Sequence, residues 1–154
     1  DFIPRKDTSC SIVVQGVKKG ENPELGIVWT ILGYPPTSVA VPLWVKDNLP
    51  AVVSYNKKLE ASPLSAASLQ LAQDKVFHYK QGGGTKHYLH WENLYNLQGT
   101  GIMQNMMKLE EEVYRNTLPL IQEFNQNKKV ETKKLDAVYQ ELEEYLEGQG
   151  VFNQ

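Results

Sequence analysis

The chain has 154 residues, the size of one domain, and a chain of this length buries about two thirds of its unfolded surface. Its 16 Lys and Arg and 18 Asp and Glu give a formal net charge of -2, which argues against nucleic acid or an anionic membrane as a partner. No apolar run approaches the roughly 18 residues of a membrane-spanning helix, so we expect no membrane span.

The first residues do not resemble a targeting sequence. The chain starts on Asp1, with neither a basic region nor an apolar region behind it, and we expect an upstream segment in the natural protein. Cys10 is the only cysteine, which excludes an internal disulfide and leaves the redox compartment open.

Residues 10–56 are rich in Val, Ile and Trp and are interrupted by Gly and Pro, a composition typical of strands joined by tight turns. Residues 18–23 and 33–36 are predicted as surface turns. The runs between them predict an antiparallel meander of four strands: Ser11–Val17, Leu25–Leu32, Ser38–Val45 and Ala51–Tyr55.

Apolar side chains occupy both parities of the second and third runs, as in Ile27-Val28-Trp29 and Val39-Ala40-Val41. Such a pattern is typical of a sheet that is covered on both faces. We therefore expect something to pack on each side of this sheet.

Residues 62–150 have a helical pattern. Ser62 and Pro63 predict the cap and first turn of a short helix that includes Leu64 to Leu71. Apolar residues from Ile102 to Phe124 recur at helical spacing, and Glu110 to Glu112 are predicted to form a solvated face.

Two further features shape the helical half. Pro119 is expected to kink or break its helix near Arg115 to Thr117, because proline lacks a backbone donor. A last helix carries the apolar stripe Leu135 to Tyr145 and is expected to end at Gly148 and Gly150. The chain is thus predicted as α+β, antiparallel strands followed by helices, with residues 1–154 forming one domain or half of one.

Cys10 is a candidate nucleophile, since a thiolate is highly reactive. However, it opens a β-branched run and has no His or Lys at a fixed spacing that would lower its pKa, so we interpret it as structural. Asp1 cannot be an N-terminal nucleophile, because that mechanism needs a hydroxyl or thiol beside its own amine.

Metal and cofactor motifs are weak. His87, His90 and Glu92 lack a further cluster that zinc would need, and we interpret them as surface or turn residues. Residues 82–86 (Gly-Gly-Gly-Thr-Lys) depart from the phosphate-loop order and predict a flexible loop. The tryptophans are interpreted as core residues. We expect no metal and no cofactor.

Arg5 precedes the first strand and lies outside any helical stripe. Its guanidinium fork could bind a carboxylate or a developing oxyanion. The alternative is a solvated arginine near the chain end.

Three segments, residues 11–17 (SIVVQGV), 29–45 (WTILGYPPTSVAVPLWV) and 92–102 (ENLYNLQGTGI), resemble bacterial proteins of the linear amide C–N hydrolase group. This group includes the penicillin acyltransferase-like and choloylglycine hydrolase-like families. The resemblance implies an αββα sandwich of the N-terminal-nucleophile hydrolases, in which two antiparallel sheets stack between helical layers.

The resemblance also implies a mechanism and a location. An N-terminal cysteine exposed by processing attacks a linear amide of a small N-acyl substrate, and its own α-amine is the base. That cysteine would lie in an upstream half, and Arg5 matches the position of a late active-site arginine, although Lys6 competes for the role. Members of the group are exported by a signal sequence.

Two hypotheses follow. In the first, the chain is the C-terminal part of a Cys-dependent amidase or acyltransferase, completed by the N-terminal half of the same precursor, and the sheet has a large apolar contact surface. In the second, it is a non-catalytic binding or structural module that contacts a protein partner through residues 33–42 and its long C-terminal helices. The first is favoured, because three helices can scarcely cover both faces of such a sheet.

Overall fold

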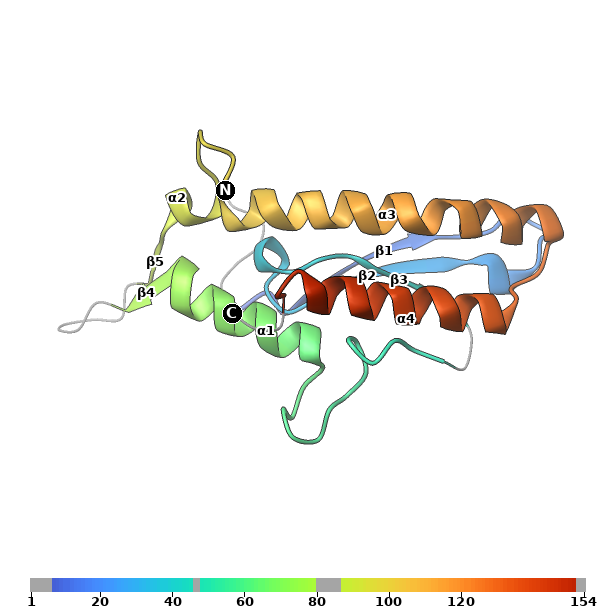
Figure 1. Cartoon of the computed structure of the whole chain (residues 1–154), viewed down its shortest axis with the longest axis horizontal. Coiled ribbons are helices and arrows are strands. Elements are labelled where there is room, and N and C mark those ends of the chain that lie inside the picture. The colour runs from blue at the N-terminus through green and yellow to red at the C-terminus, as the bar shows by residue number, and fades with distance from the viewer. Residues whose placement is uncertain (1–6, 46–47, 80–86, 152–154) are drawn as a thin grey trace.

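The computed structural model describes residues 7–45, 48–79 and 87–151, and in them a three-stranded antiparallel sheet is followed by helices (Figure 1). This confirms the predicted α+β class. The sheet has the order β1-β2-β3, with Ile12 opposite Thr30 and Val28 opposite Leu43. Its strands are β1 (Cys10–Gln15), β2 (Ile27–Leu32) and β3 (Val41–Trp44).

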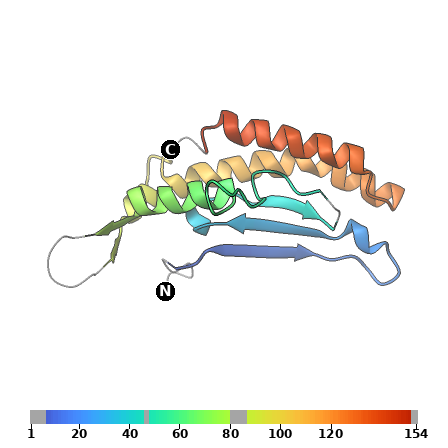
Figure 2. The same cartoon turned by 90° about the horizontal axis from the view of Figure 1, so that it is seen from below.

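Helices and a small hairpin make up the rest of the described chain. The strands β4 (Phe77–Tyr79) and β5 (His87–Leu89) form a separate two-stranded sheet. The helices are α1 (Pro63–Leu71), which continues into one π-helical turn (Ala72–Val76), α2 (Trp91–Leu94), α3 (Ile102–Asn127) and α4 (Thr132–Gly148). Figure 2 shows α3 and α4 on the β3 side of the sheet and β1 at its far side.

The main core lies where β2 and β3 meet α3 and α4. Trp44 of β3 packs its ring against Phe124 of α3, at 6.0 Å between ring centroids, and against Tyr139 of α4. Ile27 and Leu135 belong to the same cluster. A second cluster joins β3 to α1, α3 and α4 through Val41, Val52, Leu64, Met106, Val113, Leu142 and Leu146.

The helix ends follow the sequence signals. Ser62 caps α1 by accepting a hydrogen bond from the Ser65 N–H at 3.2 Å, as predicted. The helix α3 ends at Asn127, and the residue after it, Lys128, has a φ of 53° and so adopts the left-handed conformation. The helix α4 ends at Gly148 and is followed by Gly150 at a φ of 71°, which confirms the predicted stop.

Pro119 does not break α3, so the predicted break is wrong. The helix runs without interruption from Ile102 to Asn127. Pro119 and Arg115 are both exposed. Because Pro119 has no N–H, the Arg115 carbonyl lacks its usual helical donor. This carbonyl lies on the exposed side of the helix, where water can bind it, and the helix continues.

Two predictions about the segments around β3 are also wrong. Residues Ala51–Tyr55 form no strand: the N–H and Oγ of Ser54 both donate to the Pro50 carbonyl, which closes a turn. The turn at residues 33–36 is buried rather than at the surface, and Tyr34 is fully buried in it. By contrast, the turn at residues 18–23 is largely exposed, as predicted.

A buried polar cluster ties the 33–38 turn to α1. Thr37 Oγ1 lies 3.0 Å from Ser68 Oγ, and Ser68 Oγ donates to the Tyr34 carbonyl at 3.0 Å. Gly33 adopts a φ of 90°, and a Cβ at this position would lie 2.5 Å from the Ser68 side chain. Only glycine fits this contact without a shift of the helix.

Tyr34→Phe and Tyr139→Phe are expected to have opposite effects on the free energy of unfolding. The Tyr34 hydroxyl is buried without a partner among the described residues, and burial raises its pKa to about 12. Its removal should leave stability unchanged or raise it by up to about 1 kcal/mol. The Tyr139 hydroxyl accepts the Trp44 N–H at 3.2 Å, so its removal should cost roughly 1–3 kcal/mol. Urea denaturation of both variants measures the free energy of unfolding. A loss of stability in Tyr34→Phe would show that the Tyr34 hydroxyl has a hydrogen-bond partner.

Candidate interaction surface on the open side of the sheet

The apolar side chains of β1 are exposed. All six residues of the strand are exposed, and Ile12, Val13 and Val14 have relative exposures of 60, 63 and 65%. We call these three side chains the β1 surface. Exposed apolar patches of this kind mark interaction sites more often than single scattered residues do.

The β1 surface has two faces. Residues opposite one another in a sheet share a face, so Ile12 lies beside Thr30, whereas Val13 lies beside Trp29 on the other face. The Val13 face continues onto α3, because the Trp29 ring lies 5.7 Å from that of Tyr114, which is half exposed. Neither face of β1 is covered by the described chain.

The expected cover on both faces is most complete at β3 and partial at β2, where Ile27 and Thr30 are buried on opposite faces and the other four residues are half-buried. In β3, Val41 and Trp44 point to opposite faces and both are buried. Residues that follow β3 contribute to this cover: Asn48 donates to Asp136 of α4 at 2.9 Å, and the Ala51 N–H donates to Glu143. The cover thus decreases across the sheet from β3 to β1.

The backbone at the outer edge of β1 is unpaired within the described residues, where β1 pairs with β2 alone. The Gly33 N–H donates to the Ser9 carbonyl at 2.8 Å, which makes these two residues a hydrogen-bonded pair. Because hydrogen-bonded and non-hydrogen-bonded pairs alternate along an antiparallel ladder, the backbone groups of Cys10, Ile12 and Val14 point outward.

The opposite edge, along β3, is closed. By the same alternation Ala40, Pro42 and Trp44 present their backbone nitrogens to the outside. The Ala40 N–H donates to Glu110 Oε1 at 2.9 Å, the Trp44 N–H donates to the Tyr139 hydroxyl, and Pro42 has no N–H to pair. Side chains from α3 and α4 therefore end the sheet at β3.

The prediction of a solvated Glu110 is wrong, because this residue is half-buried at the β3 edge. Burial raises the pKa of its carboxyl above the ordinary value, and the hydrogen bond from Ala40 partly offsets this. The sequence signal was its spacing, four residues after the buried Met106 and three before the buried Val113.

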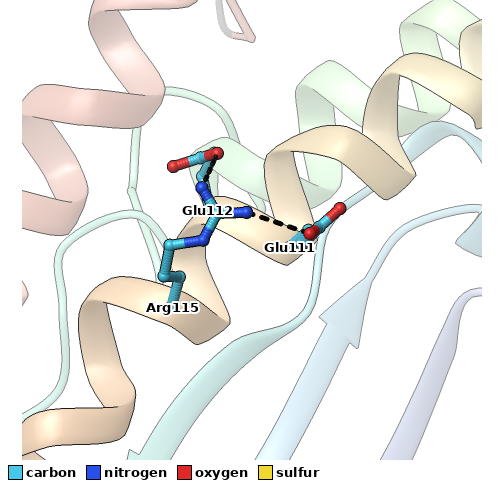
Figure 3. A network of polar contacts seen from close by, with 3 residues as sticks. All are labelled: Glu111, Glu112 and Arg115. Carbon is cyan, nitrogen blue, oxygen red and sulfur yellow. Dashed lines mark hydrogen bonds and ion pairs between the residues drawn. The ribbon is translucent and has the colours of Figure 1, made fainter.

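Of the two neighbouring glutamates, Glu111 is exposed, as predicted, whereas Glu112 is only partly exposed. Glu111 and Glu112 both accept hydrogen bonds from Arg115, at 2.9 and 2.8 Å (Figure 3). Exposed pairs of this kind contribute little to stability.

The predicted catalytic residue, Arg5, lies outside the described residues, as do Lys6 and residues 82–86. Cys10 is exposed at the start of β1. His90 and Glu92 flank the start of α2, and no group of three His, Cys, Asp or Glu side chains in the described ranges could hold a metal. Trp44 is buried in the core as predicted, whereas Trp91 is 46% exposed.

One surface hollow lies between the two long helices. It has a volume of about 590 Å³ and is lined by charged and apolar residues that include Lys108, Glu112 and Tyr145, without a Ser, Thr or Cys. No helix in the part of the chain that the structure describes is long and apolar enough to cross a membrane. We therefore take the exposed β1 edge of the sheet as the candidate functional surface.

No protein family, curated protein or solved structure matches this chain.

Val14→Thr and Val41→Thr compare one nearly isosteric change at the two ends of the same sheet face. Val14 is 65% exposed and Val41 is fully buried. The hydroxyl at position 14 reaches water, so we expect a change in unfolding free energy within about 0.5 kcal/mol. At position 41 it is buried without a partner, and we expect a loss of roughly 1–3 kcal/mol. Urea denaturation gives the change in unfolding free energy for both variants. An equal loss of stability at the two positions would show that Val14 is buried in the native protein.

Proposed function

We propose that this chain is the C-terminal part of a Cys-dependent linear amide C–N hydrolase or acyltransferase. An upstream half of the same precursor carries the nucleophile and completes an αββα sandwich on the β1 side of the sheet. The whole protein acts on a small N-acyl substrate and is exported.

The observation that carries this proposal is the β1 surface, which is apolar and exposed on both faces. Burying one Val or Ile side chain stabilises by roughly 1.5–3 kcal/mol, so leaving three such neighbours in water forgoes a large part of that gain. The first hypothesis predicts such a contact surface on the sheet.

The segments that resemble linear amide hydrolases support the same reading. Residues 11–17 include most of β1, and residues 29–45 run from β2 through β3. Two of the three segments that carry the resemblance thus lie on the sheet and include β1, whereas the third, residues 92–102, runs from α2 to the start of α3.

In the proposed reaction, the upstream cysteine thiol attacks the amide carbonyl and passes its proton to its own α-amine. The departing amine takes that proton, and water then hydrolyses the thioester to the free acid. Arg5 would contribute charge-assisted hydrogen bonds to a carboxylate of the substrate or to the oxyanion. It lies five residues before Cys10 in the sequence, and so near the start of β1 along the chain.

The alternative is a binding module that contacts a partner through residues 33–42 and the C-terminal helices. The burial of residues 33–42 argues against the first of these two contact surfaces. Tyr34 and Val39 are fully buried, and Thr37 and Ser38 are 1% exposed. This turn cannot present its side chains to a partner without unfolding from α1.

The test is expression of the full natural gene, purification without denaturant, intact-mass measurement and N-terminal sequencing, followed by assay with a set of N-acyl amines. We expect a companion chain that begins with Cys and hydrolysis of at least one amide. Arg5→Ala should lower kcat/KM by about 10²-fold or more, the size of losing an oxyanion donor. Lys6→Ala is the matched control and should remain near the wild-type value. A folded monomer of residues 1–154 alone, without hydrolysis, would contradict the proposal.

A further inference from the structure

We infer that a surface hollow beside α2 binds a neutral sugar, which stacks on the exposed rings of Trp91 and Tyr95. The hollow has a volume of about 730 Å³, within the range of about 300–1,000 Å³ that is usual for ligand sites. It includes no residue of β1, and the inference does not depend on the proposed function.

The large apolar side chains of this hollow are exposed. Trp91 and Tyr95 have relative exposures of 46 and 44%, and Leu97, which follows α2, is fully exposed. Leu97 lies in the loop between α2 and α3, which projects from the molecule (Figure 1). Exposed aromatic side chains that gather in a hollow mark a binding surface more often than single scattered ones do.

The backbone that carries the two rings is held in place. Leu94, between them in the sequence, is fully buried in a cluster with Tyr34 and Val76. Gln104 of α3 accepts the Asn96 N–H and donates to the Asn96 carbonyl, both at 3.0 Å. A site that is already formed loses less conformational entropy when a ligand binds.

The arrangement of the two rings favours a flat ligand over an organic cation. The ring centroids of Trp91 and Tyr95 are 6.2 Å apart and the ring planes differ by 30°. Two nearly parallel rings do not enclose a quaternary ammonium group from different sides, as an aromatic cage does. The C–H groups of a sugar carry a small positive charge and can lie along both ring faces, which are negative.

The polar side chains beside the rings match hydroxyl groups. Glu92 and Gln98 line the hollow and are both exposed. A carboxylate accepts hydrogen bonds and an amide both donates and accepts them, so together they can bind hydroxyl groups that do both. The described lining of the hollow contains no Lys or Arg, which argues against an anionic ligand.

The same polar groups argue against two other occupants. A lipid surface would remove water from Glu92 and Gln98 without supplying hydrogen-bond partners. A proline-rich peptide also binds aromatic grooves, but its prolines have no N–H to donate to the Glu92 carboxylate. A neutral sugar is therefore the ligand class that fits both the rings and the polar groups.

Isothermal titration calorimetry of the full natural gene product with tetrasaccharides of glucose and of N-acetylglucosamine tests this inference. We expect at least one to bind, and Trp91→Ala and Tyr95→Ala should each weaken its binding by about tenfold or more, because buried aromatic contacts dominate binding. Tyr55→Ala is the matched control: Tyr55 is 72% exposed and lies outside the hollow, so this variant should bind like the wild type. Gln98→Ala changes only an exposed loop residue and should also weaken binding, which serves if a ring variant does not fold.

Glu92→Gln distinguishes a sugar from a cation. It keeps a hydrogen-bonding group and should weaken sugar binding by no more than about tenfold. Tetramethylammonium binding that this variant abolishes would instead show a cation site. The inference is also overturned if neither tetrasaccharide binds at millimolar concentration, or if the ring variants and Gln98→Ala bind as tightly as the wild type. Binding of a polyproline peptide or of phosphatidylcholine vesicles through these rings, without sugar binding, would overturn it as well.

Discussion

The hydrogen bonds that close the β3 edge determine how the rest of the molecule is arranged. Glu110 of α3 and Tyr139 of α4 accept backbone N–H groups of Ala40 and Trp44, so both long helices are held at this side of the sheet. Their apolar faces pack there, around Trp44. Because the helical cover is concentrated at β3, little of it reaches β1.

This asymmetry links the fold to the proposed role. A sheet that ends in a proline and two helix contacts at one edge has a defined limit there. At the other edge Ile12, Val13 and Val14 are exposed beside backbone groups that pair with no strand among the described residues, which is costly for an isolated domain. The cost is removed if β1 lies in the interior of a larger sheet, as it would in a sandwich assembled from two halves.

The sequence predicted the first three strands and the long helices well, because β-branched runs and helical stripes are local signals. The sequence could not show which strands the helices cover. Val13 and Val41 both belong to apolar runs, and they differ only in what packs on them. The proline in α3 was misjudged because its effect depends on which side of the helix it occupies. The stretch from Ala51 to Tyr55 had strand composition, yet Pro50 closes it into a turn. Glu110 was missed because a run of three glutamates suggested a solvated face, although its spacing placed it inward.

Amide hydrogen exchange along β1 in the natural gene product tests the central claim most directly. The account predicts that the amides of Ile12 and Val14, which point away from β2, exchange as slowly as that of Val13, because an added strand binds them. If Val13 is protected while Ile12 and Val14 exchange rapidly in the native assembled protein, the edge is open to water and the account is contradicted.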